Sequence, residues 1–193
     1  RTLADILLGK VNPSGKLNVS FPRSTGNTPC FYNHFVTDRE EPFDQPGTPE
    51  EPKGHYIFDK PEPLWNFGHG KSYTTFDYVD CALSDTLLAA SDTLKVSVMI
   101  KNTGRCDGKE VVQLYVRDKV STVATPIQQL KAFQKVLVKS GESQCVELSL
   151  PIAELALYNA KMEEVVEPGD FEIQIGAASD DIRFKKTITI NRK

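Results

Sequence analysis

The chain has 193 residues, of which 39% are hydrophobic and 25% are charged, and its formal net charge is −3. This composition supports a packed core and excludes a chain that is disordered throughout. Charges of both signs are spread along the sequence, and no apolar run approaches the roughly 20 residues of a membrane helix, so we expect no nucleic-acid partner and no membrane span.

The first residues predict a short helix. Leu3, Ile6 and Leu7 recur at helical spacing, and Gly9 suits the end of such a helix. The stretch has neither an initiator methionine nor the form of a signal peptide. We therefore expect this chain to be a piece of a longer protein.

The region up to residue 75 is rich in proline, glycine and asparagine. The stretch "VNPSGK" at 11–16 favours a turn, because Asn-Pro and Ser-Gly pairs both interrupt regular structure. The stretches "LNVSF" at 17–21 and "PCFYNHF" at 29–35 each predict a short strand. Residues 40–53 are rich in proline and acidic side chains and predict a long loop, of the kind that is functional or mobile.

From Phe76 onward, apolar and polar residues alternate as they do in half-buried strands. Turn signals separate the alternating stretches at regular intervals, and "PIAELALYN" at 151–159 predicts one helical turn. The predicted strands are 76–84, 92–101, 110–118, 130–138, 145–150, 169–179 and 181–190. Seven strands at this spacing predict a mainly β fold, an immunoglobulin-like sandwich.

The four cysteines form no CxxC pair and no zinc-type spacing. Cys81 lies in phase with Val79 and Leu83, which predicts that all three point inward. Cys145 is out of phase with its apolar neighbours, which predicts that it points outward. We therefore expect free thiols and not a disulfide between these two residues.

His69 stands between two glycines, Gly68 and Gly70, and raises the question of catalysis. A catalytic histidine needs an orienting carboxylate and a reacting group within reach, and a metal site needs further ligands. His34 and His55 lie 35 and 14 positions away and form no HxH or HxxxH pair with it. Flanking glycines favour a tight backbone path. We favour a structural role for His69 over a catalytic or ligand-facing one, and we predict no metal site.

Two interpretations stay open for the aromatic residues Tyr56, Phe58, Trp65 and Phe67. They suit a platform on which sugar rings stack, or the packed core of a domain joint, and the joint is favoured. Glycoside hydrolysis would need two carboxylates about 5–9 Å apart. The 26 acidic residues include no pair that the sequence alone identifies.

Five stretches carry a family resemblance, in order and with matching spacing. They are "ADILLGKVNPSGKLNVSFPRS", "LWNFGHGKSYTTFDY", "IKNTGRCDGKEVVQLYVRD", "QQLKAFQKVLVKSGES" and "EPGDFEIQIGAAS". Together they resemble the C-terminal part of glycoside hydrolase family 3, the periplasmic-type bacterial β-glucosidases and β-xylosidases in particular. The first is similar to the end of the family's α/β domain, the second to the connector signature, and the last three to its fibronectin type III-like domain.

The resemblance implies three segments. Residues 1–60 would be the tail of an α/β sandwich domain, 61–75 a connector with the FGHG signature, and 76–193 a fibronectin type III-like sandwich. The parent would be a retaining exo-acting β-glycosidase that hydrolyses terminal β-linked glucose or xylose and needs no cofactor. The family's nucleophilic Asp and acid/base Glu lie upstream of Arg1, so we expect no catalytic residue here and no activity from this piece alone.

The remaining expectations concern sites and partners. The structural hinge is expected at Gly68, His69, Gly70 and Tyr73. Candidates for the rim of the substrate cleft are His34, His55, Tyr56 and Trp65. The expected partners are the family's (β/α)8 barrel and α/β sandwich domains and, through them, a carbohydrate; a homodimer stays open, and the resemblance implies a periplasmic or secreted location.

A rival interpretation is an independent carbohydrate- or protein-binding sandwich. Such a module would need exposed aromatic side chains on the sandwich itself, because flat rings supply much of the contact with sugars. Tyr115 and Tyr158 are the candidates that the sequence offers.

Overall fold

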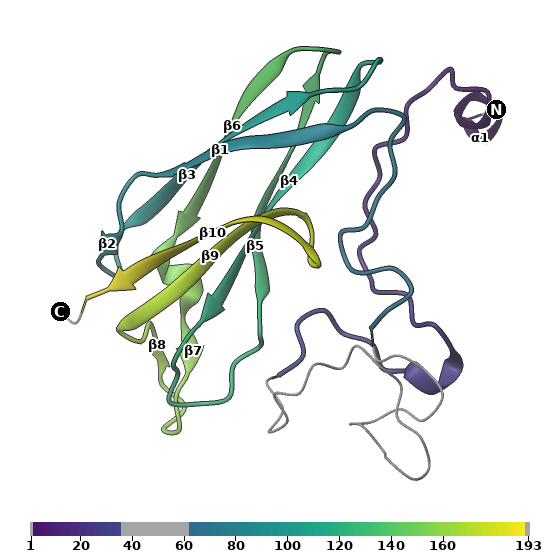
Figure 1. Ribbon diagram of the computed structural model, residues 1–193. Helices are drawn as coiled ribbons and strands as arrows, with labels where there is room; N and C mark the ends of the chain where they lie inside the picture. The colour runs from purple at the N-terminus through teal and green to yellow at the C-terminus, as the bar shows by residue number, and fades with distance from the viewer. Residues whose placement is uncertain (1, 36–61, 192–193) are drawn as a thin grey trace, which may run out of the picture.

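The structure is a computed structural model that describes residues 2–35 and 62–191. An extended N-terminal segment, which begins with the short helix α1 (Thr2–Leu7), lies alongside a β-sandwich that starts at Phe76 (Figure 1). The predicted loop at 40–53 and the rim candidates His55 and Tyr56 lie outside the described residues.

The sandwich consists of a three-stranded and a five-stranded sheet (Figure 1). The smaller sheet has the order β1-β3-β6, with the bounds Phe76–Leu83, Thr93–Asn102 and Ser143–Pro151. The larger sheet has the order β2-β10-β9-β4-β5, with the bounds Leu87–Leu88, Asp181–Ile190, Gly169–Ala178, Gly108–Asp118 and Gln129–Val138. Neighbouring strands are antiparallel except β2, which runs parallel to β10. The predicted mainly β sandwich and its seven long strands are confirmed.

Three short elements complete the fold. Strands β7 (Leu157–Tyr158) and β8 (Glu164–Val165) form a small hairpin at one end of the sandwich. The 3-10 helix η2 (Ile152–Leu155) supplies the helical turn predicted for this region, and a second 3-10 helix, η1 (Thr25–Asn27), lies in the N-terminal segment.

The core lies between the two sheets and follows from the period of two in the strands. On β3, Leu94, Val96, Val98 and Ile100 are all fully buried, while the residues between them face outward or lie at the margin. They pack against the inward side chains of the facing sheet, such as Leu114. Burial of these aliphatic side chains is the main force that holds the sandwich together.

Strand β1 corrects one detail of the predicted phase. Cys81 is buried, as predicted, and its burial raises the pKa of its thiol. Val79, predicted to share that face, is exposed instead, because a β-bulge between Tyr78 and Asp80 shifts the register by one residue. Cys145 is exposed, as predicted.

The predicted N-terminal helix is present and ends as expected. Gly9 has a φ of +70° and its N–H donates to the Ile6 carbonyl at 2.9 Å, which closes the last turn. Leu3, Leu7 and Leu8 remain exposed, so the apolar face of α1 has no cover from the described residues. No helix within residues 2–35 and 62–191 is long and apolar enough to cross a membrane.

The two strands predicted in the N-terminal segment are wrong. Each stretch forms only an isolated bridge, Phe21 with Trp65 and Phe35 with Pro126. Near the first, Gly68 turns the partner chain with a φ of +82°, which interrupts the ladder. At the second, Pro126 has no N–H to donate, which removes a ladder hydrogen bond.

Candidate functional site: the joint between the N-terminal segment and the sandwich

Two stretches of the N-terminal segment, residues 12–21 and 64–73, run side by side and form what we call the joint (Figure 1). The Gly68 N–H donates to the Leu17 carbonyl at 2.7 Å, and the Leu17 N–H donates to the His69 carbonyl at 2.8 Å. The predicted hinge is therefore held by backbone hydrogen bonds to a stretch about fifty residues earlier in the chain.

Both glycines of the FGHG signature are required by space, and Gly68 is required by its backbone angle as well. A Cβ on Gly68 would lie 3.0 Å from the Ala178 Cα and would collide with the Gln113 side chain. A Cβ on Gly70 would lie 2.7 Å from the Lys16 Cδ. Only glycine lets the connector approach the sheet and the neighbouring stretch this closely.

The joint covers the outer face of β4. Gln113 and Tyr115 point away from the sandwich core, yet they are only 2% and 0% exposed. Tyr32 stacks on Phe67 with ring centroids 4.1 Å apart and meets the Tyr115 ring edge-on at 5.9 Å. These aromatic contacts replace water over the sheet and fix the segment against it.

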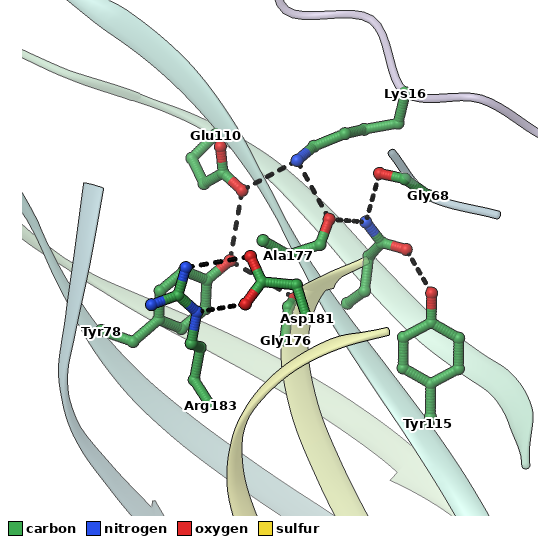
Figure 2. Close-up of polar contacts among 10 residues, drawn as sticks. Lys16, Gly68, Tyr78, Glu110, Tyr115, Gly176, Ala177, Asp181 and Arg183 are labelled. Atoms are coloured by element: carbon green, nitrogen blue, oxygen red, sulfur yellow. Dashed lines mark hydrogen bonds and ion pairs between the residues drawn. The ribbon is translucent and has the colours of Figure 1, made fainter. Parts of the chain in front are cut away.

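Hydrogen bonds beneath the rings join the same elements (Figure 2). The Tyr115 hydroxyl donates to the Gln113 Oε1 at 2.6 Å. The Gln113 Nε2 in turn donates to the Ala177 carbonyl at 2.5 Å and to the Gly68 carbonyl at 3.4 Å. One amide thus links β4 and β9 to the connector, and burial raises the pKa of Tyr115 above its usual value.

An ion pair fastens the other edge of the joint (Figure 2). The Lys16 Nζ lies 3.1 Å from the Glu110 Oε1 and donates to the Ala177 carbonyl at 3.0 Å; the two charged side chains are 17% and 8% exposed. The Tyr78 hydroxyl donates to the same carboxylate oxygen at 3.2 Å. Burial raises the pKa of Tyr78, and the charge and hydrogen bond of Glu110 raise it further.

Asn12 anchors the connector at its C-terminal end. Its Oδ1 accepts hydrogen bonds from the Ser72 hydroxyl at 3.0 Å and from the Tyr73 N–H at 2.8 Å. Its Nδ2 donates to the Asp107 carbonyl at 3.0 Å, in the turn between β3 and β4. The Tyr73 hydroxyl donates to the Ile6 carbonyl of α1 at 2.7 Å. Asn12 thus links the connector to the sandwich, and Tyr73 links the connector to the helix.

His69 takes part in the joint through its backbone. Its ring is half-buried and makes no hydrogen bond within the described residues. In the same part of the chain, no group of three or more His, Cys, Asp or Glu side chains could hold a metal ion. The geometry therefore favours the structural interpretation of the FGHG signature.

Of the rim candidates that the structure describes, Trp65 lies in the joint, where its carbonyl accepts a hydrogen bond from the Phe21 N–H at 2.8 Å, and His34 lies outside it. Trp65 is 46% exposed and meets the Phe21 ring edge-on at 5.8 Å. The His34 carbonyl accepts a hydrogen bond from the Ile127 N–H at 2.9 Å, in the loop between β4 and β5. Among the described residues, no hydrogen bond or ring contact joins His34 to Trp65.

Sequence reasoning missed the residues that receive the connector, above all Lys16, Tyr32, Glu110 and Gln113. One signal was available: around Gln113 and Tyr115, strand β4 is buried on both faces, and its sequence "VVQLYV" shows little alternation. A strand without alternation indicates that something covers its outer face. Tyr115 is accordingly wrong as a candidate for an exposed binding residue, whereas Tyr158 is exposed.

Comparison with known families agrees with this geometry. Residues 1–73 match the glycosyl hydrolase family 3 C-terminal domain, and residues 110–179 match the fibronectin type III-like domain. The chain belongs to glycoside hydrolase family 3. The first match ends at Tyr73, inside the joint, and the second lies within the sandwich, so the family 3 resemblance predicted from the five stretches is confirmed.

Individual family 3 proteins match almost the whole chain. A β-xylosidase of Formosa agariphila is 40% identical over 99% of the chain, and the periplasmic β-glucosidase of Salmonella typhimurium is 38% identical over 94% of it. A crystal structure of β-glucosidase from Listeria innocua in complex with glucose covers 100% of the chain, with a TM-score of 0.87 and 36% identity. The chain spans only about a quarter of each protein: 25%, 23% and 26% respectively.

Proposed function

We propose that this chain is the non-catalytic C-terminal region of a retaining exo-acting β-glycosidase that hydrolyses terminal β-linked glucose or xylose. The observation that carries the proposal is the match of the whole chain to a β-glucosidase crystallised with glucose. The relatives include β-glucosidases and β-xylosidases, which supports both sugars as substrates. The nucleophilic Asp and the acid/base Glu would belong to the part of the enzyme that precedes Arg1.

The role proposed for this region is to support the catalytic domains. The N-terminal segment, up to residue 60, would complete the α/β domain, and the connector at 61–75 would hold the fibronectin type III-like sandwich against it. The hinge residues Gly68, His69, Gly70 and Tyr73 would fix the angle between the two. Their contacts support this role, since every one of them is tied to the joint by its backbone, its side chain or the space it leaves free.

The partner would be the (β/α)8 barrel and the rest of the α/β domain of the same enzyme. Leu3, Leu7 and Leu8 on α1 are 69%, 74% and 70% exposed, and Phe31 is 62% exposed. An exposed apolar group such as the three leucines of α1 marks a surface that another protein part covers. A substrate would be reached through that partner, with His34, His55, Tyr56 and Trp65 as candidates for the rim of the cleft.

The location and the oligomeric state complete the proposal. The periplasmic β-glucosidase of Salmonella typhimurium supports a periplasmic or secreted location. A homodimer is the second open property, and light scattering on the longer enzyme would decide between one and two copies.

The assignment is tested by hydrolysis of an aryl β-glucoside and an aryl β-xyloside. We expect no turnover by residues 1–193 alone and turnover of at least one substrate by a protein that also contains the upstream domains. Turnover by the chain alone would overturn the non-catalytic role. Lack of turnover of both substrates by the longer, folded protein would overturn the hydrolase assignment.

A further inference from the structure

A small cavity opens at the end of the sandwich near the β7–β8 hairpin, far from α1 (Figure 1). Its volume is about 60 Å³. Its polar lining comes from the end of β4, the following loop and the start of β5, and consists of Asp118, Thr125, Gln129 and Lys131. The joint does not use this cavity.

Asp118 lines the cavity and has a buried carboxylate oxygen without a partner within the described residues. The Asp118 Oδ1 accepts a hydrogen bond from the Val120 N–H at 3.2 Å, but the buried Oδ2 has none within the described residues. Native proteins seldom bury an acceptor without a donor, because the group loses its hydration and gains nothing in return. Burial and the nearby Glu167 raise the pKa of Asp118.

Hydrogen-bond donors line the same cavity. The Lys131 Nζ donates to the Glu154 carbonyl at 2.8 Å, which leaves two of its three N–H groups for another acceptor. The side chains of Thr125 and Gln129 make no hydrogen bond within the described residues, so their polar groups are also available.

The chemistry of this lining excludes most ligand classes. A cation is disfavoured by the Lys131 ammonium, and an anion by the Asp118 carboxylate. A wholly apolar ligand would leave both groups without hydrogen bonds. A neutral hydroxyl group satisfies both, because it donates to a carboxylate and accepts from an ammonium or an amide at the same time.

We propose that this cavity is a second carbohydrate site, which binds two adjacent hydroxyl groups of a glucose or xylose unit. Pro126, Leu155 and Phe171 supply the apolar wall that the C–H groups of a sugar edge require. The cavity has room for the edge of a sugar ring and not for the whole ring. The rest of the unit would lie in an adjoining hollow of about 280 Å³, which shares Asp118, Thr125 and Pro126 with the cavity.

The site goes beyond the hydrolase assignment, and only the choice of glucose and xylose as ligands rests on that proposed function. It would bind sugar in a pocket of the sandwich, whereas the rival interpretation required exposed aromatic side chains on the sandwich. The loop that forms it, 118–127, also contacts the rim candidate His34 through Ile127. A sugar held here would therefore keep the enzyme near glycan chains without entering the catalytic reaction.

The test is an NMR titration of the ¹⁵N-labelled chain with glucose and with xylose, followed through the amides of Lys119, Val120 and Thr125. We expect saturable shifts with at least one sugar. Asp118→Asn should weaken the affinity about tenfold, because a hydrogen bond to a charged acceptor is replaced. Thr125→Val tests the same pocket without a change of charge and should also weaken binding. Asp77→Asn, at an exposed position of β1, is the matched control and should bind as the wild type does.

Three results would overturn the proposal. The first is no saturable shift with either sugar, which would leave the cavity to water. The second is equal binding by wild type, Asp118→Asn and Thr125→Val, which would place the sugar elsewhere. The third is a saturable response of the same amides to sodium or ammonium chloride and not to sugar. None of them affects the test of hydrolase activity, which uses the longer protein.

Discussion

Replacement of Gly68 by alanine should loosen the joint. The φ of +82° disfavours an alanine by about 1–2 kcal/mol. The new methyl group would also lie 3.0 Å from the Ala178 Cα and against Gln113, and relief of such crowding costs about 1–3 kcal/mol. We therefore expect a loss of about 2–5 kcal/mol in the free energy of unfolding of the joint.

Gly141→Ala is the matched control. Its φ of +77° is nearly the same, but no atom lies within 4 Å of the Cβ position. The free energy of unfolding of this variant should fall only by the backbone cost of about 1–2 kcal/mol. The difference between the two variants isolates the close approach of the connector to the sheet.

Urea unfolding followed by two probes separates the joint from the sandwich. Trp65 is the only tryptophan of the chain and lies in the joint, so its fluorescence reports on this part. Far-UV circular dichroism reports on the strands. Gly68→Ala should lower the fluorescence midpoint more than Gly141→Ala does. Equal shifts for the two variants would refute the steric argument.

Three further predictions concern the ion pair, the buried tyrosine and the helix. Lys16→Met should lower the free energy of unfolding by about 2–4 kcal/mol, because it leaves Glu110 buried without its cation. In urea unfolding, the free energy lost by the double variant Lys16→Met/Glu110→Gln should be smaller than the sum of the two single losses by at least about 1 kcal/mol. The pKa of Tyr78 is raised in the folded state, so its contribution to the free energy of unfolding is complete below about pH 10 and is lost as the pH rises further. Stability should therefore decline above pH 10, and Tyr78→Phe should make this decline shallower by about 1.4 kcal/mol per pH unit. Leu7→Ser, at an exposed position of α1, should change the free energy of unfolding of this chain by less than about 0.5 kcal/mol. The same variant should weaken association with separately produced upstream domains about tenfold, measured by calorimetry, and unchanged affinity would remove α1 from that interface.

The sandwich could be predicted because its long strands carry their own signal. The alternation along β3 from Leu94 to Ile100 predicts which side chains face the core, and the turn signal that follows predicts where the strand ends. The two-residue strands β2, β7 and β8 were missed, since two residues cannot show a period. The outward turn of Val79 was missed for a related reason, because a bulge shifts the phase without a mark in the sequence.

Of the joint, only the tight path of the connector could be predicted from the sequence. Two glycines around His69 indicate a tight path, and the structure gives the reason for both. Nothing in the sequence shows what the connector approaches, because the partners are distant: Lys16 and Ala177 are 161 positions apart. Contacts of this kind depend on the way the sheets pack, and local pattern does not encode that.

The two faces of the N-terminal segment differ in chemistry, and this difference supports the place proposed for it in a longer enzyme. Toward the sandwich it uses directional contacts, such as the Lys16–Glu110 pair and the Asn12 hydrogen bonds, which fix one orientation. Away from the sandwich it presents leucines and phenylalanines, which gain free energy from burial but specify geometry weakly. In the proposed enzyme, such a segment would fix the angle of the sandwich and add its apolar side chains to a larger core. In the proposed enzyme the joint would determine how the sandwich is placed on the catalytic domains, and Gly68 and Gly70 allow the close approaches on which the joint is built.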